Sequence, residues 1–257
     1  MRKSRSICVE FESDSRLQRT ALPLAGASET MAALSRPCVR TSLAGKSQSL
    51  ESRQQGWRLC VKNAFDRLAA FCGLIVLTPV FIVVCLLVWL SMGRPVIFRQ
   101  KRPGRNGKPF EVLKFRTMSE RRDRNGTLLP DADRLTRVGR LLRATSLDEL
   151  PQLWNVLRGE IGLVGPRPLL MEYLPRYSPE QARRHEVQPG ITGWAQINGR
   201  NALTWEEKFA LDNWYVDHWS LTLDARILLT TILRVVRRDG VSAADHATMS
   251  EFHGRYK

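Results

Sequence analysis

The chain has 257 residues, of which 43% are hydrophobic, so it can build a core and is not wholly disordered. Its 40 lysines and arginines outnumber 25 aspartates and glutamates, giving a net charge of +15. A chain this basic is expected to meet nucleic acid, anionic lipid or a phosphate-bearing substrate. The cysteines form no C-x-x-C pair and lie near no histidine cluster, which argues against a structural zinc site and a disulfide framework.

Residues 1–56 are rich in serine, arginine and small residues and show little periodicity. No continuous apolar segment follows the basic start, so a cleaved secretory signal is not expected. We interpret residues 1–56 as a disordered extension. An upstream translation start would explain it, since Met31 lies inside it, and a functional tail is the alternative.

Residues 69–90 contain no charged side chain. A helix of this length covers a bilayer core of roughly 30 Å. Lysines and arginines flank the run on both sides, although the positive-inside rule expects them on the cytoplasmic side only. A helix that crosses the bilayer once cannot place both basic flanks on the cytoplasmic side. We therefore expect residues 57–93 to be a membrane anchor that does not cross the bilayer as a straight helix.

The pair Thr78-Pro79 lies near the middle of this run. Proline has no N–H for the helical ladder and kinks a helix, whereas the threonine hydroxyl can bond back to an upstream carbonyl. The break and the two basic flanks predict a re-entrant helix that returns to the cytoplasmic face. An ordinary kinked transmembrane helix is the alternative.

Residues 94–145 hold 15 of the basic side chains against five acidic ones. Such a stretch next to a membrane segment is typical of a polybasic surface on anionic lipid, at roughly 1 kcal/mol per basic residue. It is also typical of a phosphate-binding site close to the membrane. The two interpretations are compatible.

The rest of the chain indicates a mixed, mostly helical domain. We expect a short helix over Glu149–Arg158 ended by Gly159, an aromatic-rich helix over Thr204–Leu221, and an amphipathic helix over Arg226–Arg238. The amphipathic helix suits a membrane interface or the protein's own core. The expected fold is α+β and mostly helical: a re-entrant membrane helix, a cytoplasmic catalytic domain at 94–240 with interfacial amphipathic helices, and a tail at 241–257.

Asp148 and Glu149 are adjacent carboxylates directly after the basic stretch. A capping box with Ser146 as the N-cap is one interpretation, but Pro151 would then face a helical carbonyl. With Asp148 as the N-cap, the proline occupies a position without a helical N–H partner. A carboxylate at a helix N-terminus also suits an ionised group beside a phosphate. Both interpretations stay open.

Several basic side chains are candidate phosphate ligands. Arg167 stands between two prolines, which fix the backbone and present its guanidinium fork. A rigid surface turn is the structural alternative. Lys114, Arg116 and Arg143 belong to segments that also fit a half-buried strand or a membrane-facing surface.

A glycine-rich loop at residues 188–200 carries Gln196, Asn198 and Arg200 as candidate substrate contacts. It lacks the spacing of a P-loop or of a dinucleotide fingerprint.

Four strings carry a resemblance: FRQKRPGRNGKPFEVLKFRTM, LRATSLDELPQLWNVLRGEIGLVGPRP, QPGITGWAQINGR and YVDHWSLTLDARIL. Together they resemble the bacterial sugar transferases, which are monotopic phosphoglycosyl transferases. The resemblance runs from about residue 58 to about residue 240 and leaves residues 1–56 outside. The four-span N-terminal region of larger family members is missing, so the chain resembles the minimal catalytic form.

The resemblance implies a reaction and the residues that perform it. Asp148 would attack the sugar-bearing phosphorus of a UDP-sugar, release UMP and form a phosphosugar–aspartate intermediate. Undecaprenyl phosphate would then take the sugar phosphate. Glu149 would help to hold Mg²⁺, and family members break their re-entrant helix at a Ser-Pro or similar pair, here Thr78-Pro79. The enzyme would lie on the cytoplasmic face of the bacterial inner membrane, in contact with its lipid, with no nucleic acid partner.

Two other functions remain as alternatives. A membrane-anchored basic adaptor for nucleic acid or acidic lipid would explain the anchor and the charge, but not the Asp148-Glu149 pair. A metal-dependent lipid-phosphate hydrolase would resolve the same intermediate with water. The sequence names neither the sugar nor the pathway, and a homodimer stays open.

Overall fold

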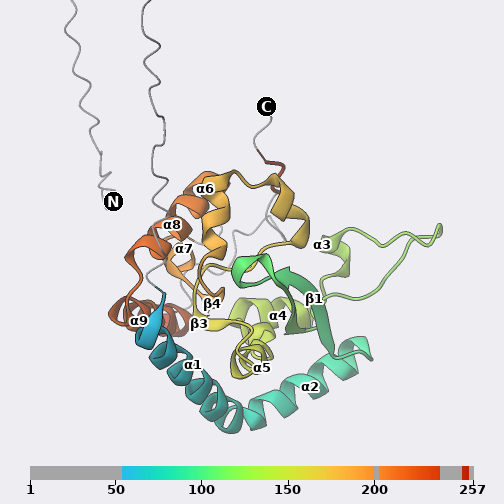
Figure 1. Cartoon of the computed structure of the whole chain (residues 1–257). Helices are drawn as coiled ribbons and strands as arrows, with labels where there is room; N and C mark the ends of the chain where they lie inside the picture. Colours follow the sequence, from blue (N-terminus) through green and yellow to red (C-terminus); the bar gives the residue numbers. More distant parts are fainter. Residues whose placement is uncertain (1–53, 200–202, 238–250, 255–257) are drawn as a thin grey trace, which may run out of the picture. The chain divides into compact units, whose positions relative to one another are not determined.

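The computed structural model describes residues 54–199, 203–237 and 251–254. Residues 1–53 of the expected extension, Arg200, and most of the expected tail at 241–257 lie outside this part. The described residues form helices and two small sheets, which confirms an α+β, mostly helical class (Figure 1).

The helices and strands follow in this order: α1 (Gly56–Val76), α2 (Thr78–Met92), β1 (Ile97–Pro103), β2 (Pro109–Phe115), α3 (Asp131–Arg134), α4 (Arg137–Thr145), α5 (Gln152–Leu157), β3 (Gly162–Val164), α6 (Pro179–Ala182), β4 (Gly190–Thr192), α7 (Trp194–Ile197), α8 (Trp205–His218) and α9 (Leu221–Arg237). Short 3₁₀ turns are η1 (Arg105–Gly107), η2 (Leu147–Glu149), η3 (Met171–Arg176) and η4 (Arg183–His185).

The apolar run is broken where the proline predicts. Helix α1 ends at Val76, α2 begins at Thr78, and the two helices are bent by 66°. The Thr78 hydroxyl donates to the Leu74 carbonyl at 2.7 Å, as expected. Among the described residues no single helix has the length and hydropathy of a membrane span, although the bent pair has them together.

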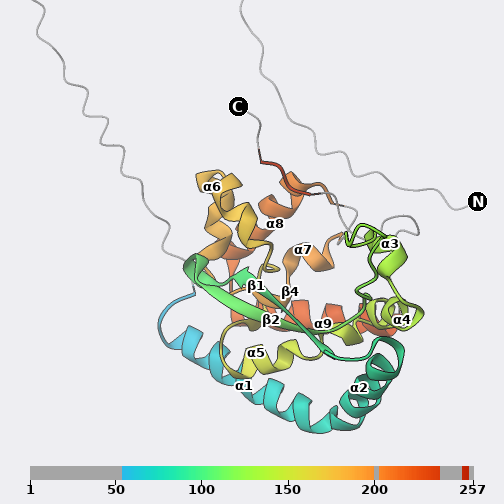
Figure 2. The ribbon, with the colours of Figure 1, turned by 90° about the vertical axis from the view of Figure 1, so that its right-hand side faces the viewer.

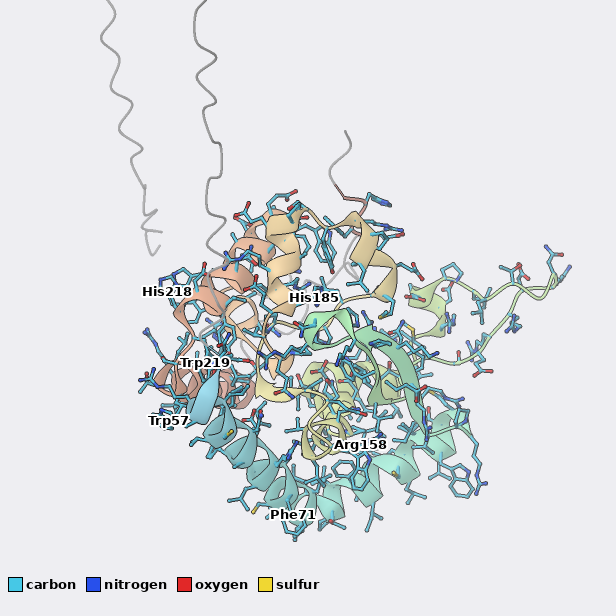
Figure 3. The ribbon with its side chains drawn as sticks, viewed as in Figure 1. Trp57, Phe71, Arg158, His185, His218 and Trp219 are labelled. Carbon is cyan, nitrogen blue, oxygen red and sulfur yellow. The ribbon has the colours of Figure 1, made fainter. Side chains whose placement is uncertain are left out.

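The bent pair forms one edge of the domain, with α5 lying above it in both views (Figures 1 and 2). Its outer side exposes large apolar side chains, and Phe71 lies at this edge in Figure 3. The exposed members include Phe65, Leu68, Phe71, Ile75, Val76, Ile82, Val83, Leu86, Trp89 and Leu90. The inner side of α2 packs Val84 and Val88 against Phe115 of β2 and Leu142 of α4.

Strands β1 and β2 form an antiparallel hairpin in which Ile97 pairs with Phe115 and Pro103 pairs with Pro109. The segment Lys114–Met118, expected as a half-buried strand, is partly confirmed, because β2 ends at Phe115. Lys114 therefore lies one residue before the end of β2, opposite Phe98, and Arg116 lies just beyond the strand.

Strands β3 and β4 are parallel, with Gly162 opposite Gly190 and Val164 opposite Thr192. The glycines allow a close backbone approach: a Cβ on Gly190 would lie 2.1 Å from the Gly165 nitrogen. A larger residue cannot fit there, and the approach joins the Gly165–Pro168 turn to the glycine-rich loop.

The largest buried cluster of the described residues includes Tyr215 of α8, Ile227 of α9 and Trp219 in the connection between these two helices. The single helix expected over Thr204–Leu221 is wrong at its end, because extended backbone at Trp219 (ψ 134°) separates α8 from α9. The Ser220 hydroxyl accepts a bond from the Leu223 N–H at the start of α9. The amphipathic helix expected from Arg226 therefore begins five residues earlier, at Leu221.

The described C-terminal residues 251–254 pack on the body of the domain. Phe252 is buried against Tyr173, Tyr177, Trp205 and Phe209. Its carbonyl accepts a bond from the Arg176 guanidinium at 2.6 Å. This part of the expected tail thus contributes to an aromatic cluster with η3 and α8.

Candidate active site

The turn that carries Asp148 and Glu149 begins where α4 ends. Ser146 closes α4 in a left-handed conformation (φ 57°), and the 3₁₀ turn η2 follows. Neither expected N-cap is formed, because no side chain caps η2 or α5 and α5 begins only at Gln152. Pro151 occupies the N-cap position of α5, which leaves the Asp148 carboxylate clear of the helix end.

Apolar side chains on either side of the two carboxylates fix this turn. Leu147 and Leu150 pack against the cluster formed by Val84, Val88, Phe115 and Leu142. The turn therefore lies on α4 and β2, and it shares one apolar cluster with α2. Asp148 is buried, with 8% of its surface exposed, and lies at the boundary between that cluster and the polar site.

Glu149 is held by two cations from different elements. Its Oε1 atom accepts a bond from Lys114 Nζ at 2.7 Å, and both of its oxygens accept bonds from the Arg167 guanidinium. Burial alone would raise the pKa of Glu149, but Arg167 and Lys114 lower it to about 2. The carboxylate is therefore ionised under all physiological conditions.

Asp148 has the opposite electrostatic environment. Burial and the neighbouring Glu149 charge raise its pKa, while Lys114, Arg167 and Arg143 oppose that rise. Two adjacent carboxylates are thus made unequal: Glu149 is paired with cations, and Asp148 carries a less stabilised charge. Unequal neighbours of this kind are common at functional sites.

Arg167 projects from the turn that follows β3. The Gly165 N–H donates to the Thr192 carbonyl at 2.9 Å, and the Gly190 N–H donates to the Pro166 carbonyl at 3.1 Å. The turn is fixed on β4 by these bonds, while the Arg167 side chain stays 45% exposed. This confirms the expected rigid turn and shows that it also presents an accessible guanidinium.

The other two predicted phosphate ligands lie differently. Arg143 donates from Nε to the Thr117 hydroxyl at 3.1 Å and is among the charges that act on Asp148. The Arg116 guanidinium instead donates to the carbonyls of Met92, Gly93 and Arg94, where α2 ends. The structure thus does not bring Arg116 into contact with Glu149, and its role as a phosphate ligand stays a prediction.

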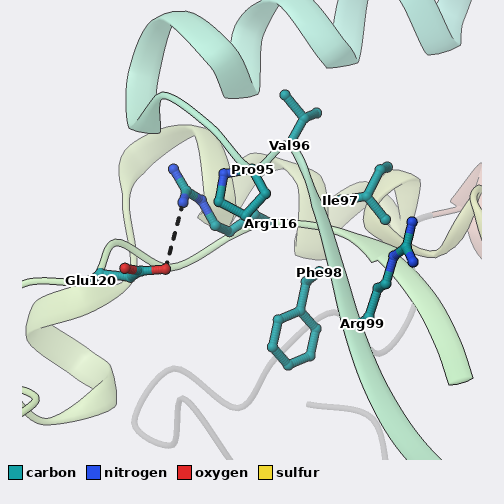
Figure 4. A pocket seen from close by; sticks show the side chains of 7 residues that line it. All are labelled: Pro95, Val96, Ile97, Phe98, Arg99, Arg116 and Glu120. Atoms are coloured by element: carbon teal, nitrogen blue, oxygen red, sulfur yellow. Dashed lines mark ion pairs between the residues drawn. The ribbon is translucent and has the colours of Figure 1, made fainter.

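Figure 4 shows the pocket beside Arg116, where the guanidinium faces Glu120 at 3.9 Å. The pocket is lined by Pro95 in the connection after α2, by the first residues of β1, including Phe98, and by Arg116 and Glu120. Arg116 therefore fixes the connection between the bent helix pair and the hairpin.

The glycine-rich loop contributes residues that the structure describes only in part. Both polar atoms of the Gln196 amide are buried and have no hydrogen-bond partner among the described residues. Asn198 is exposed and donates to the Trp194 carbonyl at 2.8 Å. Arg200 lies outside the described residues. The role of this loop in substrate binding stays a prediction.

Comparison with known proteins identifies the family of this chain. Residues 57–238 match the model of a family described as bacterial sugar transferase. The chain belongs to that family. As a member it is an enzyme of the transferase class, which agrees with the resemblance drawn from its motifs.

Similar proteins include EpsL of Bacillus subtilis, an uncharacterised sugar transferase, which is 55% identical over 196 residues, 76% of this chain and 97% of EpsL. A UDP-glucose:undecaprenyl-phosphate glucose-1-phosphate transferase of Caulobacter vibrioides is 41% identical over 190 residues, 69% of this chain and 70% of that protein. An undecaprenyl-phosphate glucose phosphotransferase of Komagataeibacter xylinus is 43% identical over 199 residues, and the match covers 70% of this chain but 36% of that protein.

The structure adds basic residues near Arg167 that sequence reasoning did not select. Burial and the nearby Arg167 charge lower the pKa of Arg102 in β1 to about 10. The same two causes lower the pKa of Lys208 in α8. Arg102 belongs to one of the four motif strings, which is a signal that could have identified it as a candidate phosphate ligand. Lys208 lies in an aromatic-rich helix and has no such signal.

The donor set of the transferase fits a magnesium ion only in a limited way. Among the described residues, no three His, Cys, Asp or Glu side chains gather as a metal site. Mg²⁺, however, usually binds one or two protein carboxylates and completes its shell with water and substrate phosphate. Glu149 supplies one such carboxylate, which is compatible with a metal that arrives together with a phosphate substrate.

Proposed function

We propose that this sugar transferase moves a hexose-1-phosphate from a UDP-sugar to undecaprenyl phosphate. An Asp148 oxygen attacks the β-phosphorus, the bond to the α-phosphate oxygen breaks, and UMP leaves. The phosphosugar is then esterified to Asp148. A phosphate oxygen of undecaprenyl phosphate attacks the same phosphorus, which frees the Asp148 carboxylate and yields undecaprenyl-diphosphate-sugar. Such a product would start an exopolysaccharide, capsule, O-antigen or glycoprotein glycan.

The observation that carries this proposal is the contrast between the two adjacent carboxylates. A nucleophilic carboxylate must be ionised but not tied up by cations, and Asp148 has a raised pKa beside a paired Glu149. The family membership and the names of the Caulobacter and Komagataeibacter relatives support the same chemistry.

Lys114 and Arg167 are suited to receive the phosphate groups. Both bind Glu149, yet the Lys114 and Arg167 side chains keep 25% and 45% of their surface exposed. An incoming diphosphate offers these donors additional oxygens, and a guanidinium can bind two of them at once. The charge that moves toward the leaving UMP is thereby neutralised by residues already in place.

A bound Mg²⁺, held by Glu149, would supply further neutralisation of phosphate oxygens. Because Lys114 and Arg167 already bind the Glu149 oxygens, at least one of these cations would have to turn toward substrate phosphate for Glu149 to hold the metal. Substrate and metal would then bind cooperatively.

The bent pair α1–α2 is proposed as a re-entrant anchor on the cytoplasmic face of the inner membrane. Its 66° bend and its apolar outer side support this topology, and its basic flanks would then lie on one side. The anchor would hold the Asp148 turn near the headgroups, where the phosphate of a lipid acceptor lies.

The first experiment measures UMP release by the detergent-purified protein with Mg²⁺, undecaprenyl phosphate and a panel of UDP-sugars. We expect release with at least one sugar and loss of turnover in Asp148→Asn. Asp133→Asn, a change to an exposed carboxylate in the same domain, serves as the matched control and should keep full activity. Full activity of Asp148→Asn would overturn the nucleophile assignment.

Intact mass measurement tests the covalent step separately. With a UDP-sugar and no lipid acceptor, the wild-type chain should gain the mass of one hexose phosphate, and Asp148→Asn should gain none. Release of sugar phosphate into water at the full rate without lipid would favour the hydrolase instead. The adaptor alternative finds no support in the comparisons, and tight nucleic acid binding without UMP release would be needed to revive it.

A further inference from the structure

Behind the Arg167 turn lies an ion pair that the reaction scheme does not use. Arg184 of η4 and Asp212 of α8 approach to 2.8 Å (Nη2 to Oδ2), and their side chains are 3% and 5% exposed. The same Arg184 Nη2 atom donates to the backbone carbonyl of Arg167 at 2.7 Å. A charged group from one element thus binds the backbone of the residue that clamps Glu149.

The Arg184 guanidinium is oriented by further contacts. Its Cζ atom lies 5.5 Å from the centre of the Phe209 ring, and Nη1 donates to the Tyr177 hydroxyl at 3.5 Å. A buried ion pair rarely adds net stability over a well-packed apolar pair, because desolvation offsets the attraction. The contribution of this ion pair is instead to orient Arg184, because the donors of a guanidinium point in fixed directions.

We propose that Arg184 and Asp212 are positioning residues for Arg167, and that they fix its backbone so that its guanidinium lies over Glu149 and the incoming phosphate. This inference rests on the function proposed above. Asp212 orients Arg184, Arg184 holds the Arg167 carbonyl, and Arg167 binds both Glu149 oxygens. Neither Arg184 nor Asp212 needs to touch the substrate.

The chain offers a matched control. Arg183 and Asp217 also form an ion pair between η4 and α8, one residue away on η4 and about one turn away on α8. Their side chains are 26% and 34% exposed, and the bonds described for Arg183 go to Asp217 and Glu186. This pair joins the same elements without reaching Arg167.

The experiment is a double-mutant cycle on UMP release. Arg184→Gln and Arg183→Gln are each measured alone and combined with Arg167→Gln. A displacement of about 1 Å at a phosphate ligand can lower turnover roughly 100-fold, so we expect a loss of about 10- to 100-fold for Arg184→Gln. With Arg167→Gln present, the further loss should shrink to less than about threefold, because coupled residues are not additive. Arg183→Gln should change little in either background.

An equal loss from Arg184→Gln in both backgrounds would overturn the positioning role, because the residue would then act on the domain as a whole. Thermal unfolding of each variant identifies a folding defect. Should Arg184→Gln not fold, Asp212→Asn takes its place in the cycle, since it keeps the side-chain size and removes only the charge that orients Arg184. A wild-type protein without UMP release would overturn the proposed function itself, which separates the two failures.

Discussion

Two lysine–carboxylate clusters in this molecule have similar parts and different environments. Lys62 in α1 is 2% exposed and lies between Asp66 at 3.1 Å and Asp224 at 2.8 Å. Neutral donors complete that cluster, since Asp224 also accepts bonds from Tyr215 and Trp219. Lys114 is 25% exposed and shares a single carboxylate, Glu149, with Arg167.

The difference lies in charge balance and access. Around Lys62 the carboxylates outnumber the cation, both Asp224 oxygens and Asp66 Oδ2 accept from donors, and all three side chains are largely buried. Around Glu149 the cations outnumber the carboxylate they bind, and both cations reach solvent. An incoming phosphate finds donors only in the second cluster. The first joins α1 to α9, and the second can take part in chemistry.

The strongest test of this contrast is Lys62→Met. The change leaves two buried carboxylates without their cation, and breaking such a pair lowers the free energy of unfolding by about 3–5 kcal/mol. Chemical denaturation in detergent measures the loss. Arg158→Gln, which removes a largely exposed ion pair with Glu160, should lower it by less than about 1 kcal/mol. Equal small changes in both variants would show that the Lys62 cluster is not structural.

The counterpart is Lys114→Met, which should affect activity and spare the fold. Burial and the nearby Arg167 lower the pKa of Lys114, so the charge is not a source of stability. Losing one preorganised donor to phosphate lowers turnover by roughly 10²- to 10³-fold. UMP release and unfolding midpoints are measured together, with the exposed Lys108→Met as control. If Lys114→Met lowered the unfolding midpoint as much as Lys62→Met does, the two clusters would not differ in their contribution to stability.

Arg167→Lys sharpens the description of the second cluster. Lysine keeps the charge but lacks the fork that binds both Glu149 oxygens. One lost charge-assisted bond of about 1.5 kcal/mol corresponds to roughly tenfold slower UMP release. Arg158→Lys is the control and should be neutral. Unchanged turnover in Arg167→Lys would show that charge alone is sufficient.

A pH dependence of stability is expected at the buried Asp212. Burial raises its pKa to about 6, against the opposing charges of Arg184 and Lys208. The folded state then holds the proton more tightly than the unfolded state, so stability falls as pH rises from about 4 to about 6. Unfolding midpoints across that range should decline more in the wild type than in Asp212→Asn. The His185 contribution has the opposite sign and cancels in the comparison, because its lowered pKa of about 4 is common to both proteins.

Local chemistry made some features predictable from sequence. The helix break at Thr78-Pro79 follows from the missing proline N–H, and the Thr78 bond to Leu74 spans only four residues. The rigid Arg167 turn follows from its two prolines. In each case the interacting groups are close in sequence, so propensity and geometry suffice.

Other features depend on contacts that sequence does not show. Glu149 meets Lys114 from 35 residues away, and Arg184 reaches Arg167 only because η4 packs on α8. Lys114 and Arg116 belong to one motif, and the sequence predicts the same role for both. Lys114 binds Glu149, but two residues later the chain has left β2, and Arg116 binds the end of α2. The N-cap expected at Asp148 is not formed for a similar reason. Ser146 ends α4, and the packing of Leu147 and Leu150 on the apolar cluster fixes the conformation of the turn.

The packing of Leu147 and Leu150 against the apolar cluster that α2 shares with β2 and α4 has a mechanical consequence. In an enzyme tethered to a bilayer by a linker, the anchor can be cut away and the catalytic body stays intact. Here the cluster beneath the Asp148 turn includes Val84 and Val88 of α2, which belongs to the proposed anchor. With α2 in the proposed membrane position, bilayer thickness, lateral pressure and detergent would act on the Asp148 turn through this shared cluster, so the lipid environment would affect the proposed chemistry as well as the location.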